Sequence, residues 1–265
     1  MDLNLKGRSV LVTGASRGIG LAIAQAFAAE GCHLRLAARD ADRLRQVAAE
    51  IGRTHGVTVE TYALDLSKQE CVVELGNRCL EVDILVNNAG GIPRGTLADV
   101  DSATWRRAWD LKVFGFIDLT RIILPHMCAR GSGTIVNVIG SAGERADPNY
   151  VAGCVGNAAL NMFVQCIGGE TVRYGVRVAA VNPGPIMTDR FMQGMLWRAE
   201  KRFGNSSRWP EILTSDLPIK RAGTPEEVAN TVVFLASDRA SYISGAAIRV
   251  DAGFLGNFKV TPETE

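Results

Sequence analysis

The chain has 265 residues, 47% of them hydrophobic and 22% charged, and its formal net charge at pH 7 is +1. This composition provides apolar material for a large core and no basic excess that would indicate a nucleic-acid partner. The first residues show no basic leader followed by an apolar segment, and no uninterrupted apolar run reaches membrane-spanning length. A cytoplasmic protein without a membrane partner is expected.

The cysteines and histidines give no sign of a metal site. Six cysteines are scattered without CxxC spacing, which in a chain of this size indicates reduced thiols, mostly in the core. Three histidines lie far apart and form no HxxxH pair. We therefore predict no bound metal.

The first elements in chain order are a strand, a tight turn and a helix. "SVLVTGA" is a short β-branched apolar run ending in glycine, and "LAIAQAFAAEG" repeats apolar residues at helical spacing. The pattern returns as "HLRLAA" before a helix over Ala41–Ile51, "VTVETYALD" before a helix near Lys68–Cys79, and "VDILVNNAG" before a helix over Ala103–Arg130.

The second half continues the alternation. "GTIVNVIGS" precedes a helix near Tyr150–Tyr174, "VRVAAVNPG" is followed later by a helix over Pro225–Ala236, and "AAIRVD" is the last strand. Strands with continuous apolar runs, separated by helices, indicate a parallel sheet covered on both faces. The sequence predicts an α/β fold in one domain over 1–265: a doubly wound, Rossmann-type three-layer sandwich with a seven-stranded parallel sheet.

Residues 187–218 interrupt this rhythm after the sixth strand. Ligands of doubly wound sheets bind beyond the carboxyl ends of the strands, so an insertion there is placed to cover a substrate. The segment holds a run of apolar residues that we expect to fold over an apolar substrate: Phe191, Met192, Met195, Leu196 and Trp197. The alternative is an irregular helical pair that makes an oligomer contact.

A glycine cluster, "TGASRGIG", joins the first strand to its helix. Gly14, Gly18 and Gly20 allow a sharp turn and bring backbone N–H groups at a helix N-terminus against a pyrophosphate. Glycines can also serve tight packing between strand and helix. The βαβ setting favours the dinucleotide site.

With this cluster, the chain resembles the short-chain dehydrogenase/reductase family over nearly its whole length. The matches are TGxxxGxG, the "NNAG" that starts at Asn87, the "NPGPIMT" that starts at Asn182, the pair Asp65-Leu66, and the tail "RAGTPEEVANTVVFLASDRASYISGAAIRVDAG". The resemblance implies a Rossmann-type fold, a nicotinamide dinucleotide, and hydride transfer to or from a carbonyl/alcohol carbon. It also implies a homodimer or homotetramer built on the two long helices and the last strand region.

The resemblance places the cofactor along four loops. The implied contacts are Gly14, Ser16, Arg17, Gly18, Ile19 and Gly20 in the first loop; Asp65 and Leu66 near the adenine; Asn88, Ala89 and Gly90 along the cofactor; and Pro183, Gly184, Ile186 and Thr188 at the nicotinamide carboxamide.

The end of the second strand bears on the choice between NADP and NAD. An acid there would bind the ribose hydroxyls and repel a 2′-phosphate, but the chain has Ala38 followed by Arg39. Together with Arg17 in the glycine loop, Arg39 predicts a phosphate clamp and therefore NADP. The alternative is that both arginines are solvated and Asp40 contacts the ribose.

Relatives in this family work with an Asn, a Ser, a Tyr and a Lys, and two alignments to that pattern are possible. Matching Tyr150 to the tyrosine puts Cys154 at the lysine position and requires three extra residues, which would rotate the following helix face by about 300°. The gap-free alignment instead puts Asn157 at the lysine, Gly153 at the tyrosine, Gly140 at the serine and Lys112 at the asparagine position. We adopt the second, in which all four positions are changed.

The replacements suggest a relocated catalytic site made of Tyr150, Lys112, Ser141 and Asn157. Lys112 would supply the cation, Asn157 a neutral hydrogen bond, and Tyr150 or an ordered water the proton. Because helical side chains lean toward the N-terminus, Tyr150 is expected to lean away from the space beside Gly153. The competing interpretation makes Lys112 a solvated or ion-paired lysine and Tyr150 a packing residue.

Two functions follow from these patterns. The first is an NADP-dependent oxidoreductase acting on the carbonyl or alcohol of an apolar small molecule. The second is a dinucleotide-binding protein without turnover, such as a sensor or a structural subunit. Turnover of NADPH with carbonyl compounds would separate them.

Overall fold

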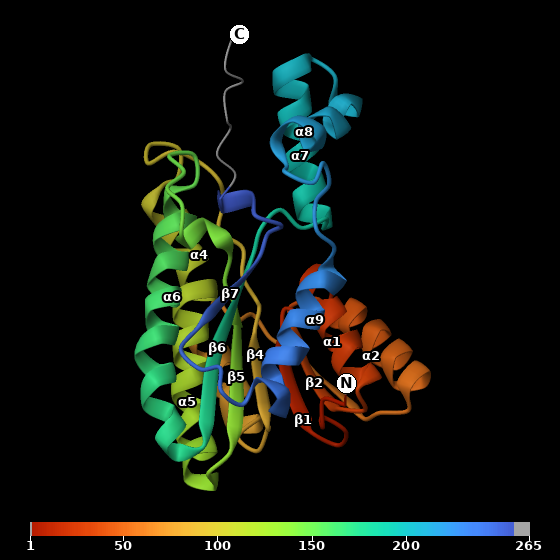
Figure 1. Ribbon diagram of the computed structural model, residues 1–265, viewed down its shortest axis with the longest axis vertical. Helices are drawn as coiled ribbons and strands as arrows, with labels where there is room; N and C mark the ends of the chain where they lie inside the picture. The colour runs from red at the N-terminus through yellow and green to blue at the C-terminus, as the bar shows by residue number, and fades with distance from the viewer. Residues whose placement is uncertain (1, 257–265) are drawn as a thin grey trace.

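Seven parallel strands form a single sheet in the computed structural model, which describes residues 2–256. The sheet has the order β3-β2-β1-β4-β5-β6-β7 (Figure 1). The strands are β1 (Ser9–Thr13), β2 (His33–Ala38), β3 (Val59–Ala63), β4 (Ile84–Asn87), β5 (Gly133–Val138), β6 (Val176–Pro183) and β7 (Ala247–Val250). The predicted doubly wound, seven-stranded parallel sheet is confirmed, while residues 1 and 257–265 of the predicted single domain lie outside the described residues.

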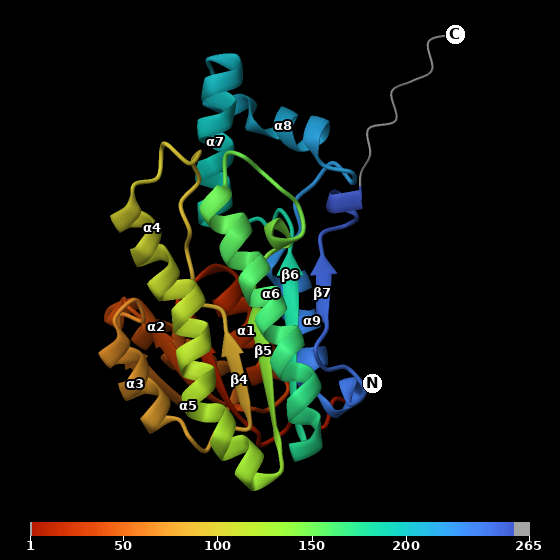
Figure 2. The same ribbon diagram turned by 90° about the vertical axis from the view of Figure 1, so that its left-hand side faces the viewer.

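Helices cover both faces of the sheet and make it a three-layer sandwich (Figure 2). Val10 and Val12 of β1 belong to the core beneath one helical layer, while Leu11 between them belongs to the core beneath the other. This alternation follows from the period of two along a strand. The first layer is α1 (Gly18–Ala29), α2 (Ala41–His55) and α9 (Pro225–Ala236), and the second is α3 (Gln69–Arg78), α4 (Ser102–Trp109), α5 (Gly115–Arg130) and α6 (Val151–Thr171).

The helix expected over Ala103–Arg130 is interrupted by a π-helical turn. Residues Asp110–Phe114 form this turn between α4 and α5, so the three pieces run on without a loop. A π turn adds a residue to one turn of helix and frequently occurs at functional sites. Lys112 is the central residue of this one.

The insertion consists of α7 (Asp189–Phe203), a 3₁₀ turn (Ser206–Arg208) and α8 (Trp209–Asp216). Its apolar side chains pack on one another in a small core of their own, with Met195, Ala199, Ile212 and Leu213 buried. In Figures 1 and 2 the pair of helices stands beyond the carboxyl ends of the strands. Short 3₁₀ turns occur at Ser141–Gly143, Val172–Tyr174, Asp238–Ala240 and Phe254–Gly256.

One helix corrects the expectation that no segment is long and apolar enough to span a membrane. The helical stretch Val151–Tyr174 meets that test with a mean hydropathy of 1.4. It passes because the mean hydropathy is high even though polar residues interrupt every apolar run, and two of these polar residues, Asn157 and Asn161, are buried within the fold. A buried core helix of a soluble protein meets the same criterion.

The cysteines also differ from expectation. All six are unpaired, but only Cys32 and Cys79 are buried, and Cys166 is exposed. The expectation of mostly core thiols is therefore wrong.

Candidate active site

The loop after β1 is built for close approach of another backbone. Gly14 has φ +69°, and a Cβ there would lie 2.9 Å from the Cα of Ala89. A Cβ at Gly20 would lie 2.2 Å from the carbonyl oxygen of Gly14. Asn88 closes the arrangement, since its Nδ2 donates to the carbonyl oxygen of Thr13 at 2.9 Å. Any side chain at either glycine would break this contact between the β1 and β4 loops.

The N-terminus of α1 is suited to a phosphate. Arg17 is the N-cap residue, no side chain accepts from the first N–H groups, and the first turn has no acid. These donors and the positive end of the helix dipole therefore remain for an anion. A Cβ at Gly18 would lie 3.4 Å from Cγ2 of Thr188, so the β1 and β6 loops meet here. Ser16 and Ile19, half-buried, complete the loop.

The two arginines predicted to bind the 2′-phosphate make no polar side-chain contact with the rest of the described protein. Arg17 and Arg39 are exposed, and within residues 2–256 neither guanidinium has an ion pair or a hydrogen bond. Asp40, the competing ribose ligand, caps α2 instead: its carboxylate accepts from the backbone N–H of Arg43 at 3.0 Å. The structure also includes Ala38 in β2, so Arg39 is the first residue beyond the strand.

The remaining predicted cofactor residues lie in the loops that leave the same edge of the sheet. Asp65 follows β3, and its carboxylate accepts from the hydroxyl of Ser67 at 2.9 Å, while Leu66 is buried beside it. The segment Asn88–Gly90 follows β4 directly. Pro183 ends β6, and Gly184, Ile186 and Thr188 lead into α7. Parallel strands place all of these loops at one edge.

Lys112 lies inside this site rather than in solvent. Its side chain runs along Gly90, where a Cβ would lie 2.8 Å from the lysine Cδ. Its ammonium donates a hydrogen bond to the carbonyl oxygen of Ile139, just after β5. The side chain thus joins the loops after β4 and β5, and Gly90 leaves the room it needs.

The same position changes the acidity of the lysine. Burial, assisted by the positive charge of Arg190, lowers the pKa of Lys112 from 10.5 to about 7. Both causes disfavour the charged form. Lys112 can therefore gain and lose a proton near neutral pH.

Asn157 occupies the space beside Gly140. Its Nδ2 lies 3.0 Å from the position that a Cβ at Gly140 would take, and Gly140 has φ +139°, which favours glycine. Asn157 is 2% exposed, and its Oδ1 is buried without a hydrogen-bond partner among the described residues. Glycine at 140 and asparagine at 157 therefore depend on each other: a serine at 140 would crowd the asparagine at 157.

Tyr150 lies over Gly153, contrary to the expectation that it leans away. A Cβ at Gly153 would lie 2.1 Å from the Cζ of Tyr150, so the ring fills the space that a side chain there would need. The expectation treated Tyr150 as helical, but it is the N-cap of α6, with φ −149° and ψ 36°. An N-cap residue is outside the helical backbone and escapes the N-terminal lean of helical side chains.

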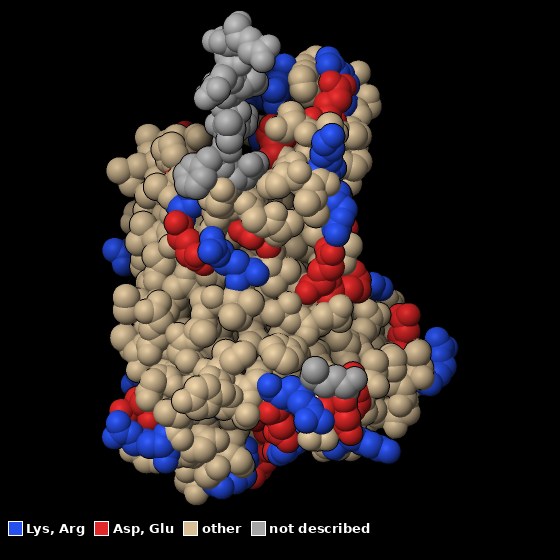
Figure 3. Space-filling view, in the orientation of Figure 1, with Lys and Arg blue, Asp and Glu red and all other residues tan. Residues whose placement is uncertain are grey.

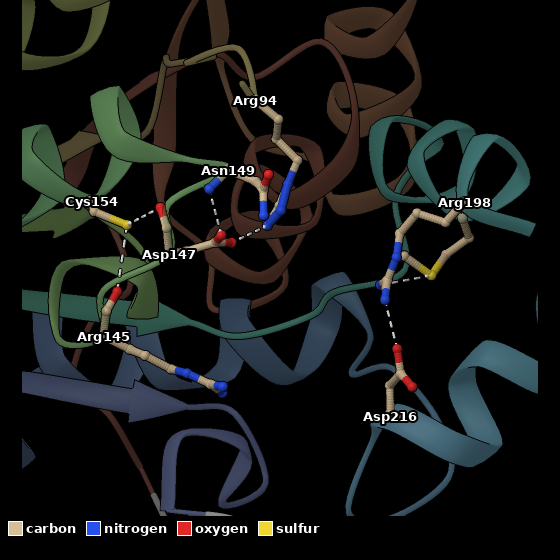
Figure 4. A network of polar contacts seen from close by, with 8 residues as sticks. Arg94, Arg145, Asp147, Asn149, Cys154, Arg198 and Asp216 are labelled. Atoms are coloured by element: carbon tan, nitrogen blue, oxygen red, sulfur yellow. Dashed lines mark hydrogen bonds and ion pairs between the residues drawn. The ribbon is translucent and has the colours of Figure 1, made fainter. Parts of the chain in front are cut away.

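Arginines surround this ring. Arg94 lies over it, with the guanidinium carbon 5.0 Å from the ring centroid, and pairs with Asp147 at 3.2 Å (Figure 4). Burial raises the pKa of Tyr150, although Arg190 and Arg94 act in the opposite direction. The phenol therefore stays protonated at neutral pH.

Two further sets of contacts in the site were not foreseen. Arg190 reaches from the start of α7 and donates to the carbonyl oxygen of Ile92. Asn182 ties the loop after β5 in place: its Oδ1 accepts from the N–H of Gly140 at 3.3 Å, and its Nδ2 donates to Glu144 at 2.7 Å. Both connect residues far apart in the chain, so local patterns do not reveal them.

Ser141 lies one residue beyond Gly140 at the start of the 3₁₀ turn and is 7% exposed. Its hydroxyl makes no hydrogen bond to another residue of 2–256. Across the same described part of the chain, no group of three or more His, Cys, Asp or Glu side chains is arranged to hold a metal ion.

Comparisons with known proteins give this geometry a family. A family model described as Enoyl-(Acyl carrier protein) reductase matches residues 14–255. The crystal structure of L-sorbose reductase from Gluconobacter frateurii, complexed with NADPH and L-sorbose, superposes with a TM-score of 0.91 at 35% identity, covering 97% of this chain and all of that one. The chain belongs to the short-chain dehydrogenase/reductase family.

Sequence relatives agree. The chain is 34% identical over 265 residues to the uncharacterised oxidoreductase YvrD of Bacillus subtilis, covering 96% of this chain and 99% of the relative. It is 31% identical over 259 residues to the 7alpha-hydroxysteroid dehydrogenase of Escherichia coli, covering 95% and 96%. As a short-chain dehydrogenase/reductase, the chain is a dinucleotide-dependent oxidoreductase, as predicted, while the roles of individual residues stay predictions.

Gly153→Ala tests whether the ring of Tyr150 keeps its position only because residue 153 has no side chain. The new methyl would lie 2.1 Å from the ring, so we expect the ring to be displaced and turnover to fall. Gly169→Ala, on the same helix, is the matched control, because no atom lies within 4 Å of a Cβ there. It should gain up to about 1 kcal/mol from helix propensity. Equal turnover and equal thermal stability of the two variants would contradict the placement of the ring.

Proposed function

We propose that this protein is an NADP-dependent oxidoreductase that transfers a hydride between the nicotinamide and a carbonyl or alcohol carbon of an apolar small molecule. The observation that carries the proposal is the position of Lys112, whose ammonium lies between the β4 and β5 loops and not in solvent. A positioned cation is what a substrate oxygen needs as negative charge develops on it.

The preference for NADP rests on charge at the adenosine end. Arg17 and Arg39 have no carboxylate partners within residues 2–256, and the carboxylate of Asp40 is engaged in capping α2. Guanidinium groups suit a phosphate, which they can bind through two parallel hydrogen bonds. The L-sorbose reductase of similar fold was solved with NADPH, which supports the same cofactor here.

The residues present fit this cofactor. The open N–H groups of α1 suit the pyrophosphate, Gly14 and Gly20 let the glycine loop pack closely against the β4 loop, and the β6 loop up to Thr188 adjoins the same place through Gly18. NADPH, when bound, supplies the hydride. The chain must then orient the substrate and supply a proton.

We assign the proton to Tyr150 and Lys112 acting together. Tyr150 remains protonated because its pKa is raised, and it offers the hydroxyl. Lys112 exchanges its proton near neutral pH, which is the range in which a general acid or base works best. Asn157 gives the neutral hydrogen-bonding group beside them, and Ser141 places a second hydroxyl one residue beyond Gly140.

The insertion, 187–218, is proposed as a cover over the substrate. Trp197 is 62% exposed and Leu196 37%, so apolar surface remains for a ligand after the insertion has formed its own core. Limited proteolysis should cut this segment readily in the apoprotein and more slowly once cofactor and substrate are bound. Cleavage of the segment that is unchanged by ligands would count against a cover.

We also propose a cytoplasmic homo-oligomer, dimeric or tetrameric. The π turn before α5 and the outer surface of α6 expose large apolar side chains, among them Phe114, Val155 and Met162, each 48–58% exposed. Figure 3 shows a broad area with few charges over the β7 side of the molecule. Such surfaces suit a symmetric contact. Light scattering that finds a monomer at micromolar concentration would refute the proposal.

The second candidate is a dinucleotide-binding protein without turnover. It is favoured by one observation: the raised pKa of Tyr150, which makes its phenol a poor acid. The deciding experiment follows NADPH absorbance over a panel of carbonyl compounds. Oxidation of NADPH with any of them supports the enzyme, whereas tight binding without oxidation across the panel supports the second candidate.

A further inference from the structure

Arg190 lies at the proposed reaction centre. It is the second residue of α7, and its guanidinium donates to the carbonyl oxygen of Ile92 in the loop after β4. Its Nη1 lies 3.3 Å from the position that a Cβ at Gly91 would take. Its charge also lowers the pKa of both Lys112 and Tyr150. The guanidinium is therefore close to the two groups assigned to proton transfer.

Three arginines of α7 and of the opposite side of the site have carboxylate partners, which Arg190 lacks. On the same helix, Arg198 pairs with Asp216 at 2.6 Å and Arg202 with the same acid at 3.6 Å. Across the site, Arg94 pairs with Asp147 (Figure 4). Within residues 2–256, Arg190 has no acid within ion-pair distance: its guanidinium donates to the neutral carbonyl of Ile92 and lies beside the neutral hydroxyl of Tyr150, whose pKa it lowers.

Arg190 is not placed where it would stabilise α7. Positive charge in the first turn of a helix opposes the helix dipole, whereas Arg198 and Arg202 lie farther along, where a cation is better placed. Thr188 already caps the helix through the N–H of Phe191 at 3.2 Å. Arg190 also repels Lys112, which raises the cost of keeping both charged in the same site.

We propose that Arg190 binds a carboxylate of the substrate, so that the protein acts on apolar oxo acids and the corresponding hydroxy acids. This inference rests on the proposed function and names its substrate class. A guanidinium has five N–H donors, enough to bind a carboxylate through two of them while keeping the bond to Ile92. The carboxylate would also offset the repulsion between Arg190 and Lys112. Met187 and Phe191 pack against the insertion's small core but are only half-buried, so part of their apolar surface remains for an apolar chain.

The anion that Arg190 binds has a second candidate besides the substrate carboxylate, namely a phosphate of the cofactor. Thr188, two residues before Arg190, adjoins the glycine loop at Gly18. The observations favour the substrate, because Arg190 is turned toward Ile92, Lys112 and Tyr150 and is bonded to the β4 loop. The test must still separate the two sources.

The experiment measures binding and turnover with matched probes. Phenylpyruvate and benzoylacetate, each with its methyl ester, are titrated into the protein loaded with NADP⁺, and oxidation of NADPH is followed with the same four compounds. We expect the wild type to bind at least one acid about tenfold or more tighter than its ester, as a charge-assisted hydrogen bond allows. Arg190→Met should remove this preference, Arg190→Lys should keep part of it, and Arg53→Met, an exposed control on α2, should leave it unchanged.

Three results would overturn the inference. The first is that neither acid binds more tightly than its ester. In the second, the preference for the acid survives Arg190→Met. In the third, Arg190→Met weakens the binding of NADPH itself and lowers the binding of acid and ester equally, which would assign the arginine to a cofactor phosphate.

The same binding and turnover measurements give a different pattern of results if the proposed enzyme activity is wrong. If acids bind selectively through Arg190 but no probe or other carbonyl compound oxidises NADPH, the enzyme proposal falls and the carboxylate site stands. If neutral ketones oxidise NADPH while acids bind no better than esters, the enzyme proposal stands and the carboxylate site falls.

Discussion

Lys112→Met is expected to lower kcat by about 100-fold or more with any carbonyl compound that the wild type reduces, which is the range of a lost general acid. The variant keeps an apolar stem of similar length along Gly90 but loses the ammonium that donates to Ile139. Steady-state oxidation of NADPH measures the loss. Lys6→Met, at an exposed lysine that precedes β1 and lies outside the site, is the control and should keep full activity.

The same substitution should stabilise the apoprotein, with a defined dependence on pH. Because folding lowers the pKa of Lys112 from 10.5 to about 7, the folded state binds this proton less well than the unfolded chain does. The resulting penalty is absent above pH 10.5, grows as the pH falls toward about 7, and is complete below that value. Removing the amine removes the penalty.

Denaturant unfolding at about pH 6 and about pH 10 measures this effect. Lys112→Met should gain stability over the wild type near pH 6 and lose most of that gain near pH 10. A functional residue that costs stability gives this combination of slower turnover and a more stable fold. A variant that is both less active and less stable at the lower pH would show that Lys112 serves the fold.

Arg39→Asp is expected to reverse the cofactor preference from NADP to NAD. The change removes a charge-assisted hydrogen bond to the 2′-phosphate and puts a repelling carboxylate beside it, which together should weaken NADP binding by about 100-fold. Calorimetric titration with NADPH and NADH measures both affinities. Arg53→Asp, at an exposed arginine in the last turn of α2, is the charge-matched control. Equal affinities of the wild type for both cofactors would contradict the clamp.

Most of the fold could be predicted because the apolar periods change clearly between strand and helix. Each of the seven expected strands forms, and the helix expected over Pro225–Ala236 has those bounds, since Thr224 and Glu227 form a capping box at its start. The helix from Ala41 runs to His55 and not Ile51, because its stop is the left-handed Gly56. The apolar period alone placed that end too early.

The π turn around Lys112 could not be predicted from periodicity. Apolar residues continue through the junction of α4 and α5, so the pattern reads as one helix. Five residues with i→i+5 bonding shift the face of every side chain that follows. The sequence therefore identified Lys112 as unusual without showing that its side chain runs along Gly90.

The chemistry of the site was foreseen in part, and the errors have physical causes. The gap-free alignment placed Lys112 and Asn157 as replacements, and the structure brings both to the adjacent residues Ile139 and Gly140. The direction of Tyr150 was wrong because a rule for helical residues was applied to an N-cap. Arg190 was missed because its partner, Ile92, lies 98 residues away along the chain.

We propose that a rearranged site, with Lys112 and Tyr150 in place of the usual groups, still performs hydride transfer. Stopped-flow measurement of a single turnover of bound NADPH tests it most directly, comparing the wild type with the Lys112→Met/Tyr150→Phe double variant. We expect both proteins to bind NADPH with similar affinity and only the wild type to oxidise it rapidly when a carbonyl substrate is added. A wild type that binds NADPH without oxidising it, or a double variant that oxidises it as fast, would contradict the proposal.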